Sequence, residues 1–110
     1  MTLDEFYTEF QAVVPKFKWQ TFQRESGNVI RTVSKDGDSI EICPVTAVCW
    51  NKTKILFESW NVYHAGKKLG LTKSDIRLII CAADQEILLG ITQDEMENCR
   101  ARLLAITQLQ

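Results

Sequence analysis

Cysteine and histidine are the residues of this 110-residue chain whose side chains could support covalent catalysis. The sequence has one histidine, His64, and four cysteines, namely Cys43, Cys49, Cys81 and Cys99. A histidine beside a thiol can act as its base, so a cysteine-dependent enzyme is one hypothesis. However, the sequence places no third group to orient the histidine. His64 also falls on an expected amphipathic helix, where we expect it to face solvent or a boundary.

These residues lack the spacing of a metal site, and the chain lacks a phosphate-binding loop. No Cys-x-x-Cys pair occurs, and no cysteine near His64 completes a zinc knuckle. The acidic pairs Asp36/Asp38 and Asp94/Glu95 flank an expected turn and begin an expected helix, which explains both locally. The glycines at positions 27, 37, 66, 70 and 90 are too scattered to cradle a phosphate. We therefore expect no catalytic residue, no metal and no cofactor.

Residues 65–79 have a pattern that could place side chains against DNA. The stretch, Ala-Gly-Lys-Lys-Leu-Gly-Leu-Thr-Lys-Ser-Asp-Ile-Arg-Leu-Ile, resembles a helix-turn-helix unit. Gly66 would let the two helices approach, and Gly70 would make the left-handed turn between them. Apolar residues would then pack the corner, namely Leu69, Leu71, Ile76 and Ile79.

The helix-turn-helix resemblance implies a DNA-binding role for three residues at the start of the second helix, Lys73, Ser74 and Arg77. Lys67 and Lys68 would then lie near the phosphate backbone. However, the continuation from Ile76 to Ala83 is apolar nearly all round, with Leu78 and Cys81 on the face that DNA contact would require to be polar. Such a helix is typical of a buried position. The alternatives are a purely structural corner and a surface that docks a protein.

Tryptophan is frequent for a chain of this length, at positions 19, 50 and 60. Tryptophan is common both at interface hot spots and in cores. We expect Trp60 to be buried between a sheet and helices. Trp50 is followed by Asn-Lys-Thr-Lys, which suggests a partner-binding patch. The candidate partner-binding residues are Trp50, Lys52, Lys54, Lys67 and Lys68.

A second resemblance rests on two short segments. The run Cys43-Pro44-Val45-Thr46-Ala47-Val48 after an expected hairpin, and the corner Leu69-Gly70-Leu71, are similar to small uncharacterised proteins of phages and bacteria. No activity is carried over from those proteins. The resemblance implies a phage or mobile-element origin and a small protein that docks onto a host or defence component.

The first half of the chain predicts one helix and a sheet. Thr2 and Glu5 form a capping-box pattern, which begins a helix over residues 3–14 that Pro15 ends. Runs of β-branched and aromatic residues follow between residues 17 and 43, separated by Ser-Gly-Asn at 26–28 and Asp-Gly at 36–37. These signals predict a three-stranded antiparallel meander.

The second half predicts three or four helices. Pro44 suits the first position of a short helix over 44–51, and a longer helix is expected from 55 to 69, ending at Gly70. Thr72 with Asp75 and Thr92 with Glu95 each begin a further helix. The fold class is therefore α+β, and residues 1–110 are expected to form one domain because neither half has enough apolar residues for its own core.

Composition and charge favour a binding protein in the cytoplasm. The chain is 45% hydrophobic with a net charge of −1, and it has no apolar run long enough to span a bilayer. The acidic N-terminal residues differ from a secretory signal, so four free thiols in a reducing compartment are expected. Residues 52–77 carry a net charge of +4 and residues 78–97 carry −5. Such polarity steers charged partners, although charges can also simply solvate helix faces.

These observations lead to one main hypothesis and two alternatives. The main hypothesis is a small non-catalytic adaptor, inhibitor or regulator that binds a protein partner. The alternatives are a helix-turn-helix DNA-binding regulator, for which nucleic acid is the partner, and a cysteine-dependent enzyme. The sequence predicts no membrane association, and it leaves the oligomeric state open.

Overall fold

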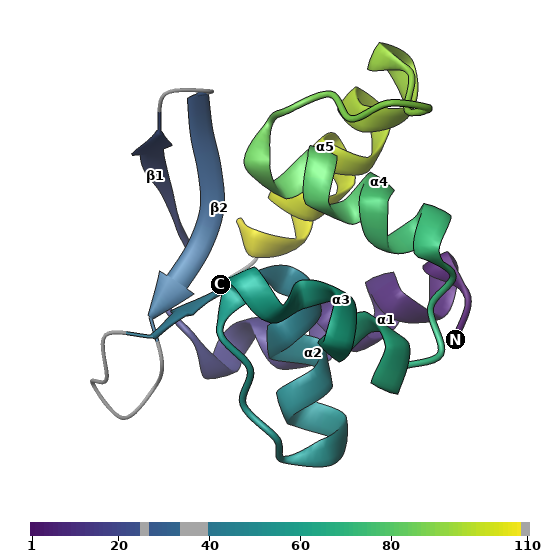
Figure 1. Cartoon of the computed structure of the whole chain (residues 1–110). Coiled ribbons are helices and arrows are strands. Elements are labelled where there is room, and N and C mark those ends of the chain that lie inside the picture. Colours follow the sequence, from purple (N-terminus) through teal and green to yellow (C-terminus); the bar gives the residue numbers. More distant parts are fainter. Residues whose placement is uncertain (25–26, 34–39, 109–110) are drawn as a thin grey trace.

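The computed structural model describes residues 1–24, 27–33 and 40–108, which form a small antiparallel sheet at one side of a group of α-helices (Figure 1). The elements follow in the order α1 (Leu3–Val13), η1 (Val14–Lys16), β1 (Gln20–Arg24), β2 (Gly27–Val33), β3 (Glu41–Ile42), α2 (Pro44–Thr53), η2 (Ser59–Asn61), α3 (Val62–Lys68), α4 (Lys73–Asp84) and α5 (Gln93–Thr107). The predicted α+β layout is confirmed, with one helix, then a three-stranded sheet, then a helical group.

The sheet is an antiparallel meander in the order β1-β2-β3, as predicted. Phe22 of β1 lies opposite Val29 of β2, and Thr32 of β2 lies opposite Ile42 of β3. Strand β2 is central and packs against α4, and its Ile30 side chain belongs to the core. The predicted Asp36-Gly37 turn and the Asp36/Asp38 pair lie outside the described residues.

Three threonines cap helices at the predicted positions. The Oγ1 atoms of Thr2, Thr72 and Thr92 accept hydrogen bonds from backbone N–H groups three residues later, at 3.1, 3.1 and 3.2 Å. Each cap satisfies one of the N–H groups that a helix start leaves without a partner. Helix α2 begins with Pro44 as predicted and extends to Thr53, two residues beyond the predicted end.

The helix predicted over residues 55–69 is wrong in its first half, since α3 begins only at Val62. Lys54 ends α2 in a left-handed conformation with φ of 62°, and the chain stays irregular until the single turn of η2. Ile55 and Phe57 have side chains that lose rotamer freedom in a helix. Leu56 and Phe57 instead pack against the core from this irregular segment.

Trp60 is 74% exposed, which contradicts the expectation that it is buried between sheet and helices. The inward positions of this region belong to smaller residues, because Val62 and Ala65 face the core. Trp60 and Tyr63 consequently lie on the outer side of η2 and α3. This difference matters for function, because it puts an aromatic surface where the sequence predicted core.

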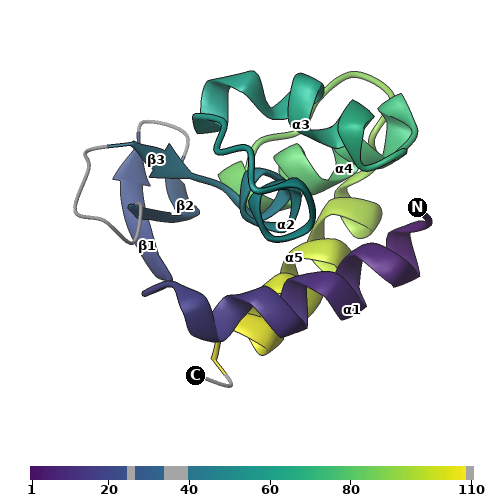
Figure 2. The ribbon, with the colours of Figure 1, turned by 90° about the horizontal axis from the view of Figure 1, so that it is seen from below.

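Apolar residues from the sheet and all five described α-helices meet in a continuous core. Helix α1 runs along the underside of the helical group, next to α2 and α5 (Figure 2). Helix α4 packs against α3, α5 and β2, which explains its apolar sequence. The largest fully buried hydrophobic side chains include Phe6, Phe10, Ile30, Ile42, Ile76, Ile79 and Leu103. In the described part of the chain, no helix is long and apolar enough to cross a membrane.

Candidate functional site

The corner between α3 and α4 has the geometry that the 65–79 pattern predicts. A Cβ atom on Gly66 would lie 2.5 Å from both Cγ1 and Cδ1 of Ile76, so only glycine allows this close contact. Gly70 has φ of +75° in the turn between the helices. The apolar residues of the corner are all buried, namely Leu69, Leu71, Ile76 and Ile79.

An open groove of about 640 Å³ lies on the outer side of this corner. It is lined by Tyr63, His64, Lys67, Leu71, Lys73, Ile76 and Arg77. Three of these side chains are cationic, and among the described residues no carboxylate lines the groove. His64 is exposed there, as predicted. The structure therefore brings Lys67 together with Lys73 and Arg77 in one basic groove.

An aromatic stripe leads into the groove from η2. Trp60 and Tyr63 are 74% and 40% exposed, and Lys67 follows Tyr63 by one helical turn of α3. The Trp60 indole N–H donates a hydrogen bond to the Glu58 carboxylate, which leaves the ring faces available. Tyr63 was not among the residues predicted for a site, although it lies three residues after Trp60 and four before Lys67, a spacing that puts all three on one side of a helix.

The groove adjoins an acidic hollow at Arg77. The guanidinium of Arg77 donates a hydrogen bond to the Leu89 backbone carbonyl, which ties α4 to the segment that joins it to α5. In Figure 1 this segment runs back along α4. An adjoining hollow is lined by Ser74, Asp75, Arg77, Leu78, Leu89, Gly90, Ile91 and Glu95.

The rest of α4 is packed as its apolar sequence predicts. Leu78 is half-buried, and Cys81 is fully buried rather than on an outer face. Lys73 and Ser74 are exposed, whereas Arg77 is half-buried against the Leu89 segment. Only the first turns of α4 can therefore contact a large ligand.

The Trp50 neighbourhood is engaged within the molecule rather than at the groove. The Trp50 ring is half-buried and packs edge-on against Phe17, with centroids 5.5 Å apart. Lys54 Nζ lies 4.9 Å from the Trp50 ring centroid. Lys52 Nζ pairs with Glu9 Oε1 at 3.2 Å. Lys68 is exposed but does not line the groove. The predicted patch of Trp50, Lys52 and Lys54 thus has structural contacts of its own.

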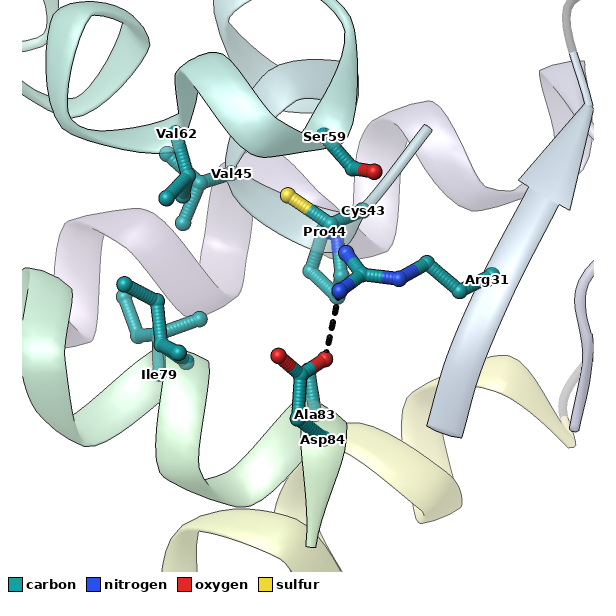
Figure 3. A pocket seen from close by; sticks show the side chains of 10 residues that line it. Arg31, Cys43, Pro44, Val45, Ser59, Val62, Ile79, Ala83 and Asp84 are labelled. Carbon is teal, nitrogen blue, oxygen red and sulfur yellow. Dashed lines mark hydrogen bonds and ion pairs between the residues drawn. The ribbon is translucent and has the colours of Figure 1, made fainter. Parts of the chain in front are cut away.

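A small cavity of about 30 Å³ lies between β2, α2 and α4 (Figure 3). Arg31 Nη2 donates to Asp84 Oδ1 at 2.6 Å there, and the Cys43 thiol lies on the same wall. The Oγ1 of Thr46 lies 3.5 Å from that sulfur, at the start of α2. The cavity has room for about one water molecule, so it cannot hold a substrate.

All four cysteines are buried and free of disulfides. Burial raises the pKa of the Cys81 and Cys99 thiols, which disfavours the reactive thiolate. Among the described residues, no cysteine lines the groove that contains His64. The described part of the chain also contains no cluster of three or more histidine, cysteine or carboxylate side chains that could hold a metal.

Comparison with protein-family models, curated proteins and solved structures found no match for this chain.

Proposed function

We propose that this protein is a small non-catalytic binding module that holds an acidic segment of a protein partner in the α3–α4 groove. The observation that carries the proposal is the exposed aromatic stripe of Trp60 and Tyr63 beside a groove with three cations. Tryptophan, tyrosine and arginine are the residues most enriched at interface hot spots. The three cations select a partner with carboxylates, and the aromatic rings offer apolar contact area.

The chemistry of the site favours a protein over duplex DNA. Asp75 and Glu95 line the hollow that adjoins the groove at Arg77, and these carboxylates would repel a phosphate backbone. Arg77 already donates to a backbone carbonyl, so it is less free to contact a base. A short acidic peptide could lie along the groove without approaching the acidic hollow.

DNA binding is a second candidate function because the α3–α4 corner has the glycines and the helix cap that the helix-turn-helix resemblance implies. The close contact at Gly66, the positive φ of Gly70 and the Thr72 cap are features that a helix-turn-helix corner would use, and they support this candidate. Lys73 and Ser74 are exposed at the first turn of α4, where such units contact DNA. The same experiment can compare both candidates.

The proposal also includes an adaptor, inhibitor or regulator role in the cytoplasm. Four unpaired thiols are typical of a reducing compartment. A phage or mobile-element origin would fit a small protein that works by docking, as the similarity of the Cys-Pro-Val-Thr-Ala-Val segment suggests.

A peptide-display selection against the immobilised protein tests the proposal without knowledge of the partner. We expect the selected peptides to combine Asp or Glu with a leucine or an aromatic residue. Trp60→Ala should weaken the binding of the best synthesised peptide by about tenfold or more, as the loss of a hot-spot residue does. Lys67→Glu and Lys73→Glu should each weaken it as well, and Lys18→Glu, an exposed lysine outside the groove, is the matched control.

Two results would contradict the proposal. One is a set of selected peptides that the Lys67→Glu and Lys73→Glu variants bind as tightly as the original protein does. The other is tighter binding of random-sequence duplex DNA, with an affinity that falls steeply as salt increases, which would favour the helix-turn-helix candidate.

A further inference from the structure

The segment between α4 and α5 presents an apolar side chain that the molecule does not cover. Leu89 is 93% exposed, and Ile87 is 46% exposed. The segment is nevertheless held in place, because Glu86 N–H donates to the Cys81 carbonyl at 3.1 Å and Ile91 N–H donates to the Leu88 carbonyl at 3.1 Å. The Arg77 guanidinium fixes Leu89 itself through its backbone. Leu89 is thus a fixed apolar projection.

This projection lies beside the basic groove and has the opposite charge around it. Arg77 lines both the groove and the hollow next to Leu89. Asp75 and Glu95 line that hollow, whereas Lys67 and Lys73 line the groove. The sequence has the same polarity, since residues 78–97 carry −5 and residues 52–77 carry +4. One face of the molecule therefore has a basic groove and, next to it, an acidic hollow beside the apolar Leu89 projection.

We propose that a second copy of this chain docks against this face, so that Leu89 and the neighbouring Glu95 of each copy lie in the basic groove of the other. A two-fold axis near Arg77 would place each half of the face against its complement. Each contact would pair Glu95 of one copy with Lys67 of the other, and Leu89 with the exposed Tyr63 ring at the groove. Charge complementarity within a single face favours a second copy as the occupant.

The inference rests on the proposed function in one respect, because it fills the same groove. Self-association would cover the cations that an acidic partner needs. The dimer is then a closed form of the binding module, and an acidic partner must displace the second copy. Binding and dimerisation should consequently compete.

Sedimentation velocity over a concentration series at low salt tests the dimer. We expect a monomer–dimer equilibrium that shifts toward monomer at high salt, because salt screens the ion pairs. Leu89→Asp and Lys67→Glu should each weaken association by about tenfold or more. Lys18→Glu changes the same charge outside the groove and should leave association unchanged. Circular dichroism checks that each variant retains its helices.

A charge exchange between two variants gives the sharpest result. Lys67→Glu and Glu95→Lys should each be monomeric, because their self-contacts pair like charges. An equimolar mixture of the two should associate again, since both contacts of the mixed dimer then pair opposite charges. A mixture that stays monomeric, or an original protein that is monomeric at every concentration, overturns the inference.

The outcome is separable from that of the proposed function. A monomeric protein that still binds acidic peptides through Lys67 and Lys73 overturns only the dimer. A dimer that dissociates with Leu89→Asp supports the dimer, and it overturns the partner proposal if the monomeric Leu89→Asp variant, whose groove is open, also binds no acidic peptide.

Discussion

At the scale of single residues, Gly66 is a helix position where substitution by alanine should destabilise the protein rather than stabilise it. Alanine normally stabilises a helix interior relative to glycine by about 0.5–1 kcal/mol. At Gly66 the new Cβ would overlap Ile76, which is 1% exposed and has little room to move. Overpacking of this kind costs about 1–3 kcal/mol, so we expect Gly66→Ala to lower the free energy of unfolding by about 1–2 kcal/mol in denaturant titrations.

A double-mutant cycle identifies the cause of the Gly66 effect. In the background of Ile76→Ala the overlap disappears, so Gly66→Ala should cost less there by about 0.5 kcal/mol or more. Gly70→Ala is the control, because its cost comes from φ of +75° and should be the same in both backgrounds. If Gly66→Ala costs the same in both backgrounds, the overlap with Ile76 is not the cause of the destabilisation.

The Tyr7–Cys99 contact makes stability depend on pH in the alkaline range. The buried Tyr7 hydroxyl donates to Cys99 Sγ at 3.1 Å. Burial, and then this hydrogen bond, raise the pKa of Tyr7 above its ordinary value, while burial raises the pKa of Cys99. The folded protein therefore keeps these protons more tightly than the unfolded chain does. The contribution is complete below the ordinary thiol pKa and is lost as pH rises above it.

Tyr7→Phe should change this profile in a defined way. The free energy of unfolding should fall by about 0.5–1.5 kcal/mol at neutral pH, because the hydrogen bond is lost. Above about pH 10, the ordinary tyrosine pKa, the free energy of unfolding of Tyr7→Phe should decrease less steeply with rising pH than that of the original protein does. The ring that Arg102 covers at 4.4 Å is retained. Tyr63→Phe, at a residue 40% exposed, should leave the profile unchanged. Parallel profiles for Tyr7→Phe and the original protein would rule out this linkage.

Individual site residues were only partly predictable. Lys67, Lys73 and Arg77, which line the groove, were candidates from the sequence because their charges and the glycines of the corner are local sequence signals. The prediction that Trp60 is buried was wrong because the sequence does not indicate which side of η2 faces the core. A large apolar side chain is normally expected on the side that does. Leu89 gave no signal, since its exposure depends on how the segment after α4 folds back along the helix.

At the scale of elements, the Arg31–Asp84 ion pair links the sheet to the end of α4. The two side chains are 13% and 23% exposed, so they are largely removed from water. Asp84 stands at the C-terminal end of α4, where the helix dipole disfavours a carboxylate. We expect Arg31→Met to lower the free energy of unfolding by about 1.5–3 kcal/mol, because the carboxylate loses a charged hydrogen-bond donor.

Two comparisons test the assignment to this ion pair. Adding Asp84→Asn to Arg31→Met should recover part of the loss, since the buried charge is removed together with its donor. Lys52→Met removes the more exposed pair with Glu9 and should cost only about 0.2–1 kcal/mol. A similar cost for Arg31→Met and Lys52→Met would mean that burial does not strengthen the Arg31 pair.

Elements with strong local signals were predicted well from the sequence. The threonine caps gave the starts of α1, α4 and α5, because side-chain capping is decided within four residues. The start of α3 was missed, since Ile55, Leu56 and Phe57 have a pattern compatible with a helix. Their actual conformation depends on packing against the distant core, which no local pattern contains.

At the scale of the whole molecule, the groove depends on a helical pair that the sheet and α5 support from behind. Helix α4 contacts β2 and α5 on its buried sides, so its outer side is held at a fixed angle to α3. Arg100 reinforces this support, because its guanidinium donates to the Ala82 carbonyl at 2.9 Å and the Asn28 carbonyl at 3.1 Å. A substitution that shifts the sheet should therefore also shift α4 and so alter the groove.

This continuity predicts that sheet and helices unfold together as one domain. The core joins residues from Phe6 to Ile106 without a break between the two halves of the chain. Trp19, which directly precedes β1, packs on Phe10 of α1, and it contacts Phe17 together with Trp50 of α2, so the two rings report on the junction of the sheet with α1 and α2. The far-ultraviolet circular dichroism signal reports mainly on all the helices. In Trp60→Phe, which removes the exposed indole, tryptophan emission reports only these two sites. We expect its denaturant transition to coincide with that of circular dichroism, as in two-state unfolding. Two separate midpoints would instead indicate that the sheet and the helical group are independent units, and the groove would then not depend on the sheet.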